Sequence, residues 1–506
     1  MALDPRTPVL VGAAALTQRV DDPSAAAEAI VLMEQALLAA ADDAGSRALL
    51  DRIDVIAVPN GTWSYPDPGR LLAERAGASA RTVLAEVGVL QQTLITRAAS
   101  DIAAGRVRVV AICGGEAKHR SLRAAITGAE APETSQPPGT EPDELLLPDG
   151  DILTATEIER ELAVPAHQYA LVESALRAAA HRSPAQHRAA LGALWSRFAA
   201  VAARNPLAWS HDALPPEAIV TPTATNRMVA TPYTKLLCSQ WNVDQAAALL
   251  LCSVEVAGAL GIERDRWVFP LVAAESNLMV PLPCRRSIGR WPAFRACARA
   301  AFEAAGCDID DVAHLDLYSC FPAAVQVQAA ELGLSLDDPR GLTVTGGMTF
   351  AGGPLNNYVL QAMVAMAQRL RADPRSRGAV TSVSGMLTKP GIGLWSSEAP
   401  RGPFQARDVT AEAAAATEVL PLDPDLTGDG VILACTVIHD RGEPGRAVAV
   451  VEAGGARSVV VSSDRDVAAR LADRECCGVV ARLDAPGQLS MIAGEDGDHT
   501  RSETTP

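Results

Sequence analysis

The fold class of this chain is decided by Leu90–Gly115, which has the sequence LQQTLITRAASDIAAGRVRVVAICGG. Apolar side chains recur at helical spacing over residues 90–104, at Leu94, Ala98 and Ile102. Gly105 would end this helix, and the apolar run 107–113 predicts a buried strand after it. A helix that leads directly into a buried strand is typical of parallel βαβ structure.

The same order of elements recurs later in the chain. Residues 355–370 predict a helix, Gly378 follows, and 379–384 predicts a strand that ends at Ser384-Gly385 as the first ends at Cys113-Gly114. Upstream, Asp54 follows the helix end at Gly45 by nine residues, and Asp316 follows the helix end at Gly306 by ten. This repeat predicts an internal duplication, with two sheets stacked around shared helices in a five-layer αβαβα body.

Further elements fit this plan. Strands are predicted at 9–14, 53–58, 267–274 and 315–318, and helices from a Ser24 cap to Gly45, at Ala246–Gly258 and at 292–305. Two long helical runs, 169–180 and 184–204, fall between the halves and indicate an inserted, mostly helical lobe. Short Val-rich runs with Gly-rich turns after residue 400 predict a small β-barrel or sandwich, and we expect the OB-like form of such a barrel.

These patterns divide the chain into five parts. The expected division is an N-terminal half (1–116 with 246–283), an inserted domain (117–245), a C-terminal half (284–398), a β-rich domain (400–495) and a disordered tail (496–506).

Composition excludes several classes of protein. The 506 residues carry a net charge of −16, with 48% hydrophobic and 21% charged residues, which is ordinary for a globular protein. An acidic chain of this kind is a poor general nucleic-acid binder. Residues 401–506 hold 10 Arg and 18 acidic residues, so 10 − 18 = −8, half of the net charge, belongs to the C-terminal region.

Cysteine usage predicts a reducing compartment. The ten Cys form no CxxC pair, which argues against a zinc ribbon or a thioredoxin motif, and no spacing of His residues fits a metal site. The first apolar run, 8–16, is too short to span a membrane and has no basic segment before it. We therefore expect a cytoplasmic protein with no membrane segment.

Several motifs resemble those of one enzyme family. They are Gly114-Gly115-Glu116, Trp241–Ala248, Tyr318-Ser319-Cys320-Phe321, Thr345-Gly346-Gly347 with Gly352-Gly353-Pro354, and Ser384-Gly385-Met386. Their order over about residues 5–398 resembles the thiolase superfamily. The chain is most similar to the sterol-carrier-type branch, and within it to the thiolase-like proteins of type 1, which carry an additional C-terminal domain.

The resemblance implies that the usual catalytic side chains are replaced. Thiolases use a nucleophilic Cys at a helix N-terminus, a second Cys as acid and base, and His or Asn in oxyanion holes. Counting back from Ile102 places Gly88 at the nucleophile position. Gly353 replaces the His of the G-H-P loop, and Ser384 replaces the second Cys. Because glycine has no reactive side chain, ordinary thiolysis or Claisen condensation is not expected.

Polar groups remain near the implied site. Tyr318, Cys320 and Ser384 are the catalytic candidates, with Ser319 and Lys389 beside them. Tyr318 could act as a general acid or base if its pKa fell. The structural alternatives are a Tyr hydroxyl anchored to backbone, a core Cys, a turn Ser and a surface Lys.

The resemblance also implies a CoA or acyl-CoA ligand, with no other cofactor and no metal. In the family the inserted lobe binds the CoA adenine and phosphates. The candidates for binding are Arg227, Tyr233, Lys235, Trp241, Gly352, Gly353 and Lys389, with Arg204 as a further basic residue. The glycines would let backbone approach the ligand, although they would equally serve tight turns.

Three functions remain open. The first is a thiolase-like protein of lipid or sterol metabolism, of the acetyl-CoA acetyltransferase type, that binds a CoA thioester without ordinary thiolase activity. The second is a lyase that breaks a C–C bond of a CoA thioester by retro-aldol or Claisen cleavage, with Tyr318 as base and the C-terminal domain as a fused partner. The third is a non-catalytic scaffold whose C-terminal domain recruits a protein. The chain is expected to be a dimer or a monomer.

Overall fold

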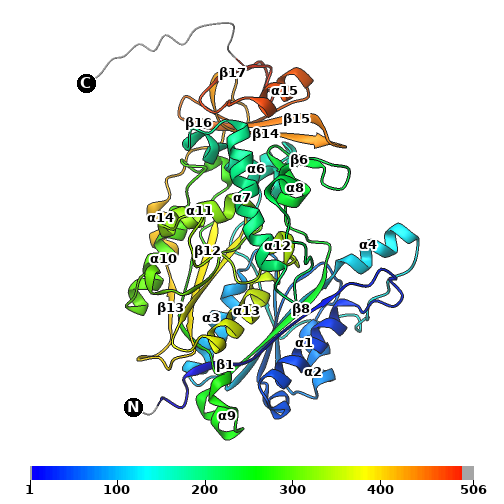
Figure 1. The fold of residues 1–506 in the computed structure, drawn as a ribbon, viewed down its shortest axis with the longest axis vertical. Coiled ribbons are helices and arrows are strands. Elements are labelled where there is room, and N and C mark those ends of the chain that lie inside the picture. Colours follow the sequence, from blue (N-terminus) through cyan, green and yellow to red (C-terminus); the bar gives the residue numbers. More distant parts are fainter. Residues whose placement is uncertain (1–2, 493–506) are drawn as a thin grey trace.

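The computed structural model describes residues 3–492, and within them the strands form three sheets (Figure 1). The first sheet has the order β1 (Pro8–Gln18), β8 (Asp244–Ser253), β4 (Val109–Ala117), β2 (Val55–Pro59), β3 (Arg81–Ala85), β5 (Glu144–Leu146). The strands β4, β2, β3 and β5 run parallel, whereas β8 is antiparallel to both β1 and β4.

The strand β8 corrects a prediction, because we expected a helix over Ala246–Gly258. Residues 244–253 form a strand in which every side chain is buried, since β8 lies between β1 and β4. A continuous apolar run occurs in buried strands and in buried helices alike, so its pattern does not separate the two. The chain turns helical only at α9 (Val254–Ala259), where the Ser253 hydroxyl accepts a hydrogen bond from the Val256 N–H at 3.2 Å.

The second sheet repeats the first. Its order is β10 (His314–Asp316), β11 (Arg377–Ser384), β12 (Lys389–Ser396), β9 (Phe269–Glu275), β13 (Gln405–Asp408). The first four strands match β2, β4, β8 and β1 in order and direction: β10 and β11 are parallel, while β12 is antiparallel to both neighbours. This match confirms the predicted duplication.

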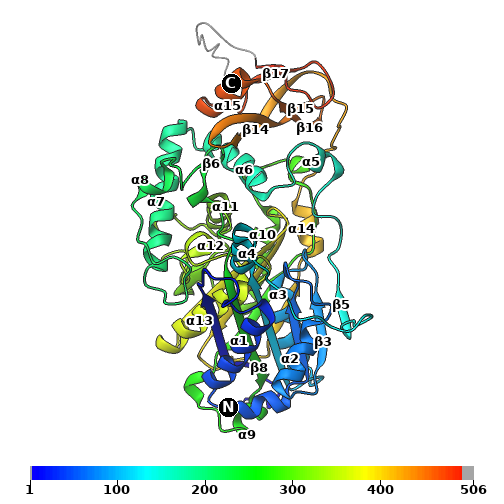
Figure 2. The same ribbon diagram turned by 90° about the vertical axis from the view of Figure 1, so that its right-hand side faces the viewer.

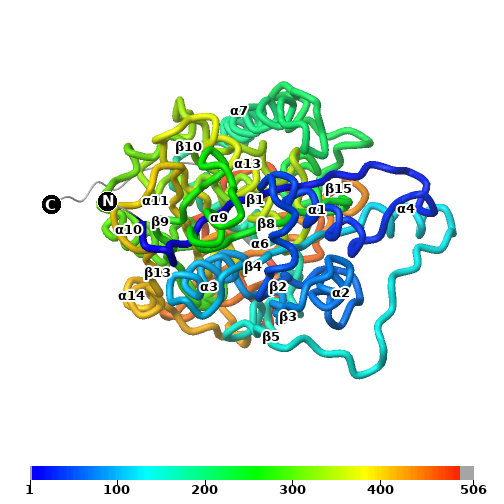
Figure 3. The backbone as a smooth tube through the Cα atoms, turned by 90° about the horizontal axis from the view of Figure 1, so that it is seen from below, coloured from blue at the N-terminus to red at the C-terminus, as the bar shows by residue number. Residues whose placement is uncertain are grey.

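Two helices lie between the sheets. α3 (Gln91–Ala103) and α13 (Tyr358–Ala372) contact strands of both sheets. α1 (Ala29–Asp43) and α2 (Pro68–Ala76) cover the outer face of the first sheet, and α10 (Pro292–Ala305) packs on the outer face of the second with α11 (Pro322–Leu332) beside it. Seen from below, the layers run from α1 and α2 at the right to α10 at the left (Figure 3). The predicted αβαβα body is therefore present.

The first helix starts later than expected. α1 begins at Ala29 with Glu28 at its N-cap, while the Ser24 hydroxyl donates to the Asp22 carboxylate at 2.7 Å instead of capping the helix. The predicted helix over 292–305 coincides with α10, and the strands predicted at 53–58 and 379–384 correspond to β2 and β11.

Helices make up most of the regular secondary structure in the segment between β4 and β8. It contains α4 (Lys118–Thr127), α5 (Ala155–Glu159), α6 (Pro165–Ala179), α7 (Pro184–Ala202), α8 (Pro216–Val220) and the hairpin of β6 (Met228–Ala230) with β7 (Tyr233–Thr234). Between α4 and β5 the chain runs around the outside of α2 (Figure 3). It then adds β5 to the edge of the first sheet, so part of this segment belongs to the N-terminal half.

The C-terminal strands form a third sheet at the top of the molecule (Figures 1 and 2). Its order is β16 (Ala456–Ser462), β15 (Glu443–Ala453), β14 (Gly428–Asp440), β17 (Val480–Leu483), β18 (Met491–Ile492), with α15 (Arg465–Asp473) after β16. The Val461 N–H donates to Gly487, and the Leu489 N–H donates to Val461, at 2.8 and 3.0 Å. These bonds join the two edges, so the sheet closes into a small barrel.

The packing of the chain crosses the expected domain limits near residues 245 and 400. β13 and α14 (Thr410–Ala416) follow residue 400 but pack on the second half, against β9 and α10. β6 of the inserted segment pairs with β14 of the barrel. The remaining elements are α12 (Gly347–Phe350) and the 3-10 turns η1 (Arg47–Arg52), η2 (Lys235–Leu237), η3 (Arg264–Arg266), η4 (Leu282–Cys284) and η5 (Ile309–Asp311). The tail predicted at 496–506 lies outside the described residues.

Candidate functional site

Loops from both halves meet at the N-terminal end of α3. Gly88 lies three residues before α3, and the Lys389 Nζ at the start of β12 donates to its carbonyl oxygen at 3.4 Å. The Gln91 side chain hydrogen-bonds the Tyr318 side chain and donates to Asn356 Oδ1 at 3.1 Å. The structure thus brings Gly88, Tyr318 and Lys389, which the sequence singled out, into one region.

Gly88 has no room for a side chain. Its φ is +108°, a conformation that residues with a Cβ rarely adopt. A Cβ atom built on it would lie 2.8 Å from Pro148 Cβ and 3.2 Å from Ile152 Cδ1. The loop 147–152 of the inserted segment therefore fills the space that a residue-88 side chain would need.

Tyr318 and Cys320 are buried and protonated. Burial raises the pKa of the Tyr318 hydroxyl far above its ordinary value of 10.0, and the neighbouring Cys320 adds to this. Burial also raises the pKa of the Cys320 thiol to about 12. We expected that Tyr318 could serve as a base if its pKa fell. The pKa instead rises, because the phenolate would be desolvated.

The two serines differ in their surroundings. Ser319 is fully buried, its Oγ accepts a hydrogen bond from the Met348 N–H at 3.2 Å, and it lies 3.4 Å from the Tyr358 hydroxyl. Ser384 is half-buried at the end of β11, where its backbone pairs with Lys389. Ser319 fixes a loop, whereas Ser384 keeps partial access to solvent at the β11–β12 turn.

A buried carboxylate holds the loop that begins at Thr345. Asp316 Oδ2 accepts hydrogen bonds from the N–H groups of Val344 and Thr345 at 3.0 and 3.1 Å, and Oδ1 accepts from the Tyr358 hydroxyl at 3.0 Å. Burial raises the pKa of Asp316, while these donors oppose the rise. The network fixes the position of Gly346 and Gly347 relative to β10.

The glycines predicted to approach a ligand approach protein instead. A Cβ on Gly352 would lie 2.1 Å from Gln245 Oε1, and one on Gly346 would lie 2.4 Å from Ala202 on α7. The Gly353 N–H donates to the Gln240 carbonyl at 2.9 Å. The tight packing of β8 and α7 against this loop accounts for the glycines.

Lys389 was expected beside the catalytic candidates, where it could bind a phosphate or pair with an acid, with a surface Lys as the alternative. The structure places it in the interior and not at the surface. Its side chain is fully buried. Within the described residues, the bond to the Gly88 carbonyl is the one hydrogen bond that the side-chain amine makes. Burial lowers the pKa of the Lys389 amine, and the Asp149 carboxylate opposes this in part. Because Lys389 opens a strand of the second sheet, its alkyl chain is held while the amine faces the start of α3.

The residues expected to bind CoA are only partly together. Arg227 and Lys235 are exposed on the β6–β7 hairpin, where the Lys235 N–H donates to the Arg227 carbonyl at 2.9 Å. Trp241 is 49% exposed, and the Lys118 Nζ lies 4.2 Å from its ring centroid. Arg204 is also exposed. Tyr233 differs from the prediction: it is fully buried, and its hydroxyl donates to Glu173 at 2.7 Å, so it has no surface for an adenine ring.

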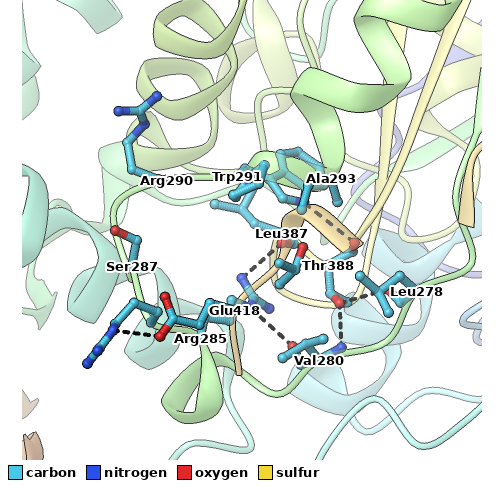
Figure 4. Close-up of a pocket in the computed structure, with 14 residues that line it drawn as sticks. Leu278, Val280, Arg285, Ser287, Arg290, Trp291, Ala293, Leu387, Thr388 and Glu418 are labelled. Carbon is cyan, nitrogen blue, oxygen red and sulfur yellow. Dashed lines mark hydrogen bonds and ion pairs between the residues drawn. The ribbon is translucent and has the colours of Figure 1, made fainter. Parts of the chain in front are cut away.

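A cavity of about 220 Å³ borders the turn before Lys389 (Figure 4). Leu387, Thr388, Arg285 and Trp291 are among the residues that line it. The Arg285 guanidinium donates to the Leu387 and Val280 carbonyls at 2.9 and 3.1 Å, and burial lowers its pKa to about 10. Backbone carbonyls accept the hydrogen bonds of this guanidinium, which therefore holds the β11–β12 turn in place.

Sequence reasoning missed Gln91 and Asn356. Both are buried, and together they connect α3 to the segment before α13. The pair Gln91-Gln92 at the start of a helix that leads into a buried strand was the available signal, because uncharged polar residues on a buried helix end need partners. No feature of the sequence indicated that the loop 147–152 covers Gly88, since the two are far apart in the chain and meet only in the folded protein.

Two searches of the described residues were negative. No helix in this part of the chain is long and apolar enough to cross a membrane. Within residues 3–492, no group of His, Cys, Asp and Glu side chains is arranged to hold a metal ion.

Comparison with known structures defines the class of protein. The chain has the thiolase-superfamily fold: the Acat5 thiolase from Ascaris suum, solved in complex with coenzyme A, matches with a TM-score of 0.53 at 17% identity over 77% of this chain and 99% of that one. The Ltp2-ChsH2(DUF35) aldolase matches with a TM-score of 0.58 at 18% identity over 78% and 99%. No protein-family model matches the sequence, and none of the curated proteins is significantly similar to it.

One neighbour matches almost the whole chain. The monomeric SCP2-thiolase like protein type 1 from Mycobacterium smegmatis has a TM-score of 0.82 and 29% identity over 97% of this chain and 100% of its own. The likeness therefore extends over nearly all of the C-terminal barrel, and it is the type that the sequence motifs resemble.

Proposed function

We propose that this chain binds CoA or an acyl-CoA in a thiolase-type body and does not carry out ordinary thiolase transfer. The binding half of the proposal is supported by the thiolase fold and by a neighbour of that fold solved with coenzyme A. The other half is supported by the geometry around Gly88. Lipid or sterol metabolism, in the cytoplasm, is the setting that we propose, and the ten free cysteines fit a reducing compartment.

The observation that carries the proposal is the environment of Gly88. A thiolate nucleophile at this position would need a side chain, and Pro148 and Ile152 occupy that space. The thiol of Cys320 is held protonated by burial, so it supplies no replacement nucleophile. The remaining chemistry at this point belongs to the Lys389 amine and to backbone donors.

The β6–β7 hairpin is the proposed entrance for the ligand. Arg227 and Lys235 present two positive charges there, and phosphate groups are bound well by such pairs. Trp241 offers an exposed ring that could stack on adenine. Each of these groups is exposed, so each can contact a nucleotide without a change in the core.

Isothermal titration with CoA, next to a thiolysis assay with acetoacetyl-CoA, tests this proposal. We expect a measurable heat with CoA and no cleavage of acetoacetyl-CoA above the uncatalysed rate. The double variant Arg227→Gln/Lys235→Gln should bind at least about tenfold more weakly, since each lost phosphate contact costs on the order of 1 kcal/mol. Arg52→Gln, an exposed arginine of η1, is the matched control. Absence of heat, or thiolysis at an enzyme-like rate, would refute the proposal.

A second candidate is a lyase that cleaves a C–C bond of a CoA thioester. The barrel favours it: five strands with a helix between the third and the fourth, closed by a parallel contact of Val461 with Gln488, is the arrangement of an OB-fold. An aldolase assembled with a DUF35 component is among the structural neighbours. In this candidate the barrel is a fused counterpart of that component, and Tyr318 is not the base because it stays protonated.

For the oligomeric state we propose a monomer. β5 pairs with β3 and so covers the edge of the first sheet that would otherwise be open for pairing with a second copy. The type 1 neighbour is described as monomeric. A third function, in which the acidic barrel recruits a protein, ranks last.

A further inference from the structure

Lys389 has an environment that its structural role does not explain. The side chain is fully buried, and one hydrogen bond of 3.4 Å leaves most of the donor capacity of the amine unused. Among residues 3–492 no carboxylate lies within ion-pair distance of it. A buried ammonium in such a place destabilises the folded chain, and an apolar side chain of the same length would pack there at lower cost.

The position of the amine is set by two rigid elements. Lys389 opens β12, which pairs along its length with β11 and β9. The amine lies against Gly88, just before the N-terminus of α3, where the positive end of the helix dipole disfavours an ammonium. Desolvation lowers the pKa of the amine further. A neutral amine is a nucleophile, whereas an ammonium is not.

We propose that the Lys389 Nζ is a catalytic amine that forms an imine with the keto group of a β-ketoacyl thioester. The inference rests on the proposed function, because the CoA site is what would bring the keto group to the amine. The nitrogen adds to the keto carbon, and the carbonyl oxygen leaves as water. The C=N bond replaces the C=O bond: one amine proton and one proton taken from solvent water leave with the oxygen, and the second amine proton stays on the nitrogen of the resulting iminium ion.

Of the two carbonyl groups of a β-ketoacyl thioester, the amine is expected to react productively with the ketone. Attack on the thioester carbonyl would expel the CoA thiol and leave a stable amide, which would end turnover after one event. Imine formation is reversible by water. An iminium ion also accepts the electron pair that is released when a proton leaves the neighbouring carbon, so the carbon between the keto group and the thioester becomes a nucleophile.

The loop 147–152 covers this amine and would have to move. Pro148 and Ile152 contact the Gly88 region, while Leu147 is 66% exposed. Asp149 on the same loop is the charged group whose field reaches the amine. Opening of the loop would therefore admit the keto group and remove the carboxylate in one motion.

The lysine content of the chain makes a sharp experiment possible. Lys118, Lys235 and Lys389 are its only lysines. The full-length protein is incubated with acetoacetyl-CoA and sodium cyanoborohydride, which reduces an iminium ion to a stable secondary amine, and the adduct is located by peptide mass spectrometry. We expect most of the adduct on Lys389 and little on Lys118 and Lys235, because a lowered pKa leaves a larger neutral fraction of the Lys389 amine at neutral pH.

The controls separate the two proposals. The Lys389→Met variant should lose the adduct, whereas the Arg52→Gln control should keep both the adduct and the heat of CoA binding. Adduct absent from Lys389 while CoA binds, or spread equally over the three lysines, would overturn the role of Lys389 and leave the CoA proposal standing. If CoA does not bind, the proposed function fails, and the same trapping with acetone tests the amine alone: no adduct on Lys389 would overturn its role.

A second readout needs no thioester. Labelling the three amines with acetic anhydride as a function of pH gives the pKa of each. The Lys389 amine should titrate below the ordinary lysine value of 10.5, and Asp149→Asn should lower its pKa further, since a favourable negative charge is removed. An ordinary lysine pKa at Lys389 would overturn the proposal.

Discussion

Two residues at one point in space, Gly88 and Lys389, depart from what their surroundings would ordinarily select. Gly88 has a conformation that excludes other residues, and Lys389 buries a charge-bearing group without a carboxylate partner. Such departures concentrate at functional sites because stability alone would remove them. Their coincidence at the start of α3 is the residue-level basis of the account.

Replacing the buried amine should stabilise the chain in a pH-dependent way. In the folded state the pKa of Lys389 lies below the value of 10.5 that it has in the unfolded chain. At pH values between the folded and the unfolded pKa, the unfolded chain therefore binds more protons. The free energy of unfolding should therefore rise as the pH increases through that window. Lys389→Met should lack this rise and be more stable at pH 7 by about 1–3 kcal/mol. Urea unfolding at pH 7 and pH 10 measures both effects; an equal stability difference at the two pH values would contradict the assignment.

Gly88 should not tolerate a side chain. We expect Gly88→Ala to lower the free energy of unfolding by about 2–4 kcal/mol, because it combines backbone strain with a clash against Pro148. Gly77→Ala is the matched control: Gly77 ends α2 with φ +69°, and a Cβ there would meet no atom within 4 Å. Chemical denaturation should show the smaller loss, about 1 kcal/mol, for the control. Equal losses would mean that the loop 147–152 does not close over residue 88.

At the scale of elements, the junction of β9, β13 and α3 contains a titrating carboxyl. Glu275 ends β9, its backbone pairs with Asp408 on β13, and the Thr96 hydroxyl of α3 donates to its carboxylate at 3.3 Å. Burial raises the pKa of Glu275 to about 7, and the charge of Asp408 adds to the rise. This junction should therefore weaken as Glu275 ionises.

The sign of that effect follows from proton binding. Because the folded pKa is above the ordinary 4.5, the folded chain holds the proton more tightly, so stability is present at low pH and is lost as the pH rises through about 7. Between pH 5 and pH 8 the loss should be about 1–3 kcal/mol. Urea midpoints should show this slope in the wild type, a flatter one in Glu275→Gln, and an intermediate one in Asp408→Asn. An unchanged slope in Glu275→Gln would contradict the assignment.

The elements also show what a sequence can and cannot determine. The helix of α10 was predicted to the residue, because Pro292 and Gly306 mark its ends by their backbone preferences. β8 was predicted as a helix, because a strand buried on both faces has no alternation to display. The placing of Cys320 and Tyr318 at the site stays a prediction, and their protonation depends on burial, which no local pattern reports. The closeness of Gly88, Pro148 and Lys389 is a product of long-range folding alone.

At the scale of the whole molecule, the barrel is tied to the rest of the chain. The buried Arg177 of α6 donates to Glu475 at 2.9 Å, and β6 adds to β14. The buried Arg457 of β16 donates to the Arg286 carbonyl at 2.7 Å. These contacts cross two borders that the sequence predicted as domain limits.

Thermal unfolding should therefore be cooperative over the described body. We expect one calorimetric transition in the full chain. If the barrel separated from the body, Arg177 would lose Glu475 and Arg457 would lose the Arg286 carbonyl, and neither guanidinium would keep this partner. A chain ending at residue 417 should unfold at least about 5 °C lower, since lost contacts of several kcal/mol shift the midpoint by that order. Two separate transitions, with the upper one unchanged by the truncation, would contradict this.

The central claim is that a CoA thioester reaches the Gly88–Lys389 point without meeting a thiol nucleophile. A crystal structure of the full chain with CoA tests it most directly. The account predicts adenine and phosphates near Arg227 and Lys235, and the thiol end near the Lys389 amine after the loop 147–152 has moved. CoA bound with its thiol end away from Lys389, or crystals soaked in CoA that show none bound in the thiolase-type body, would contradict it.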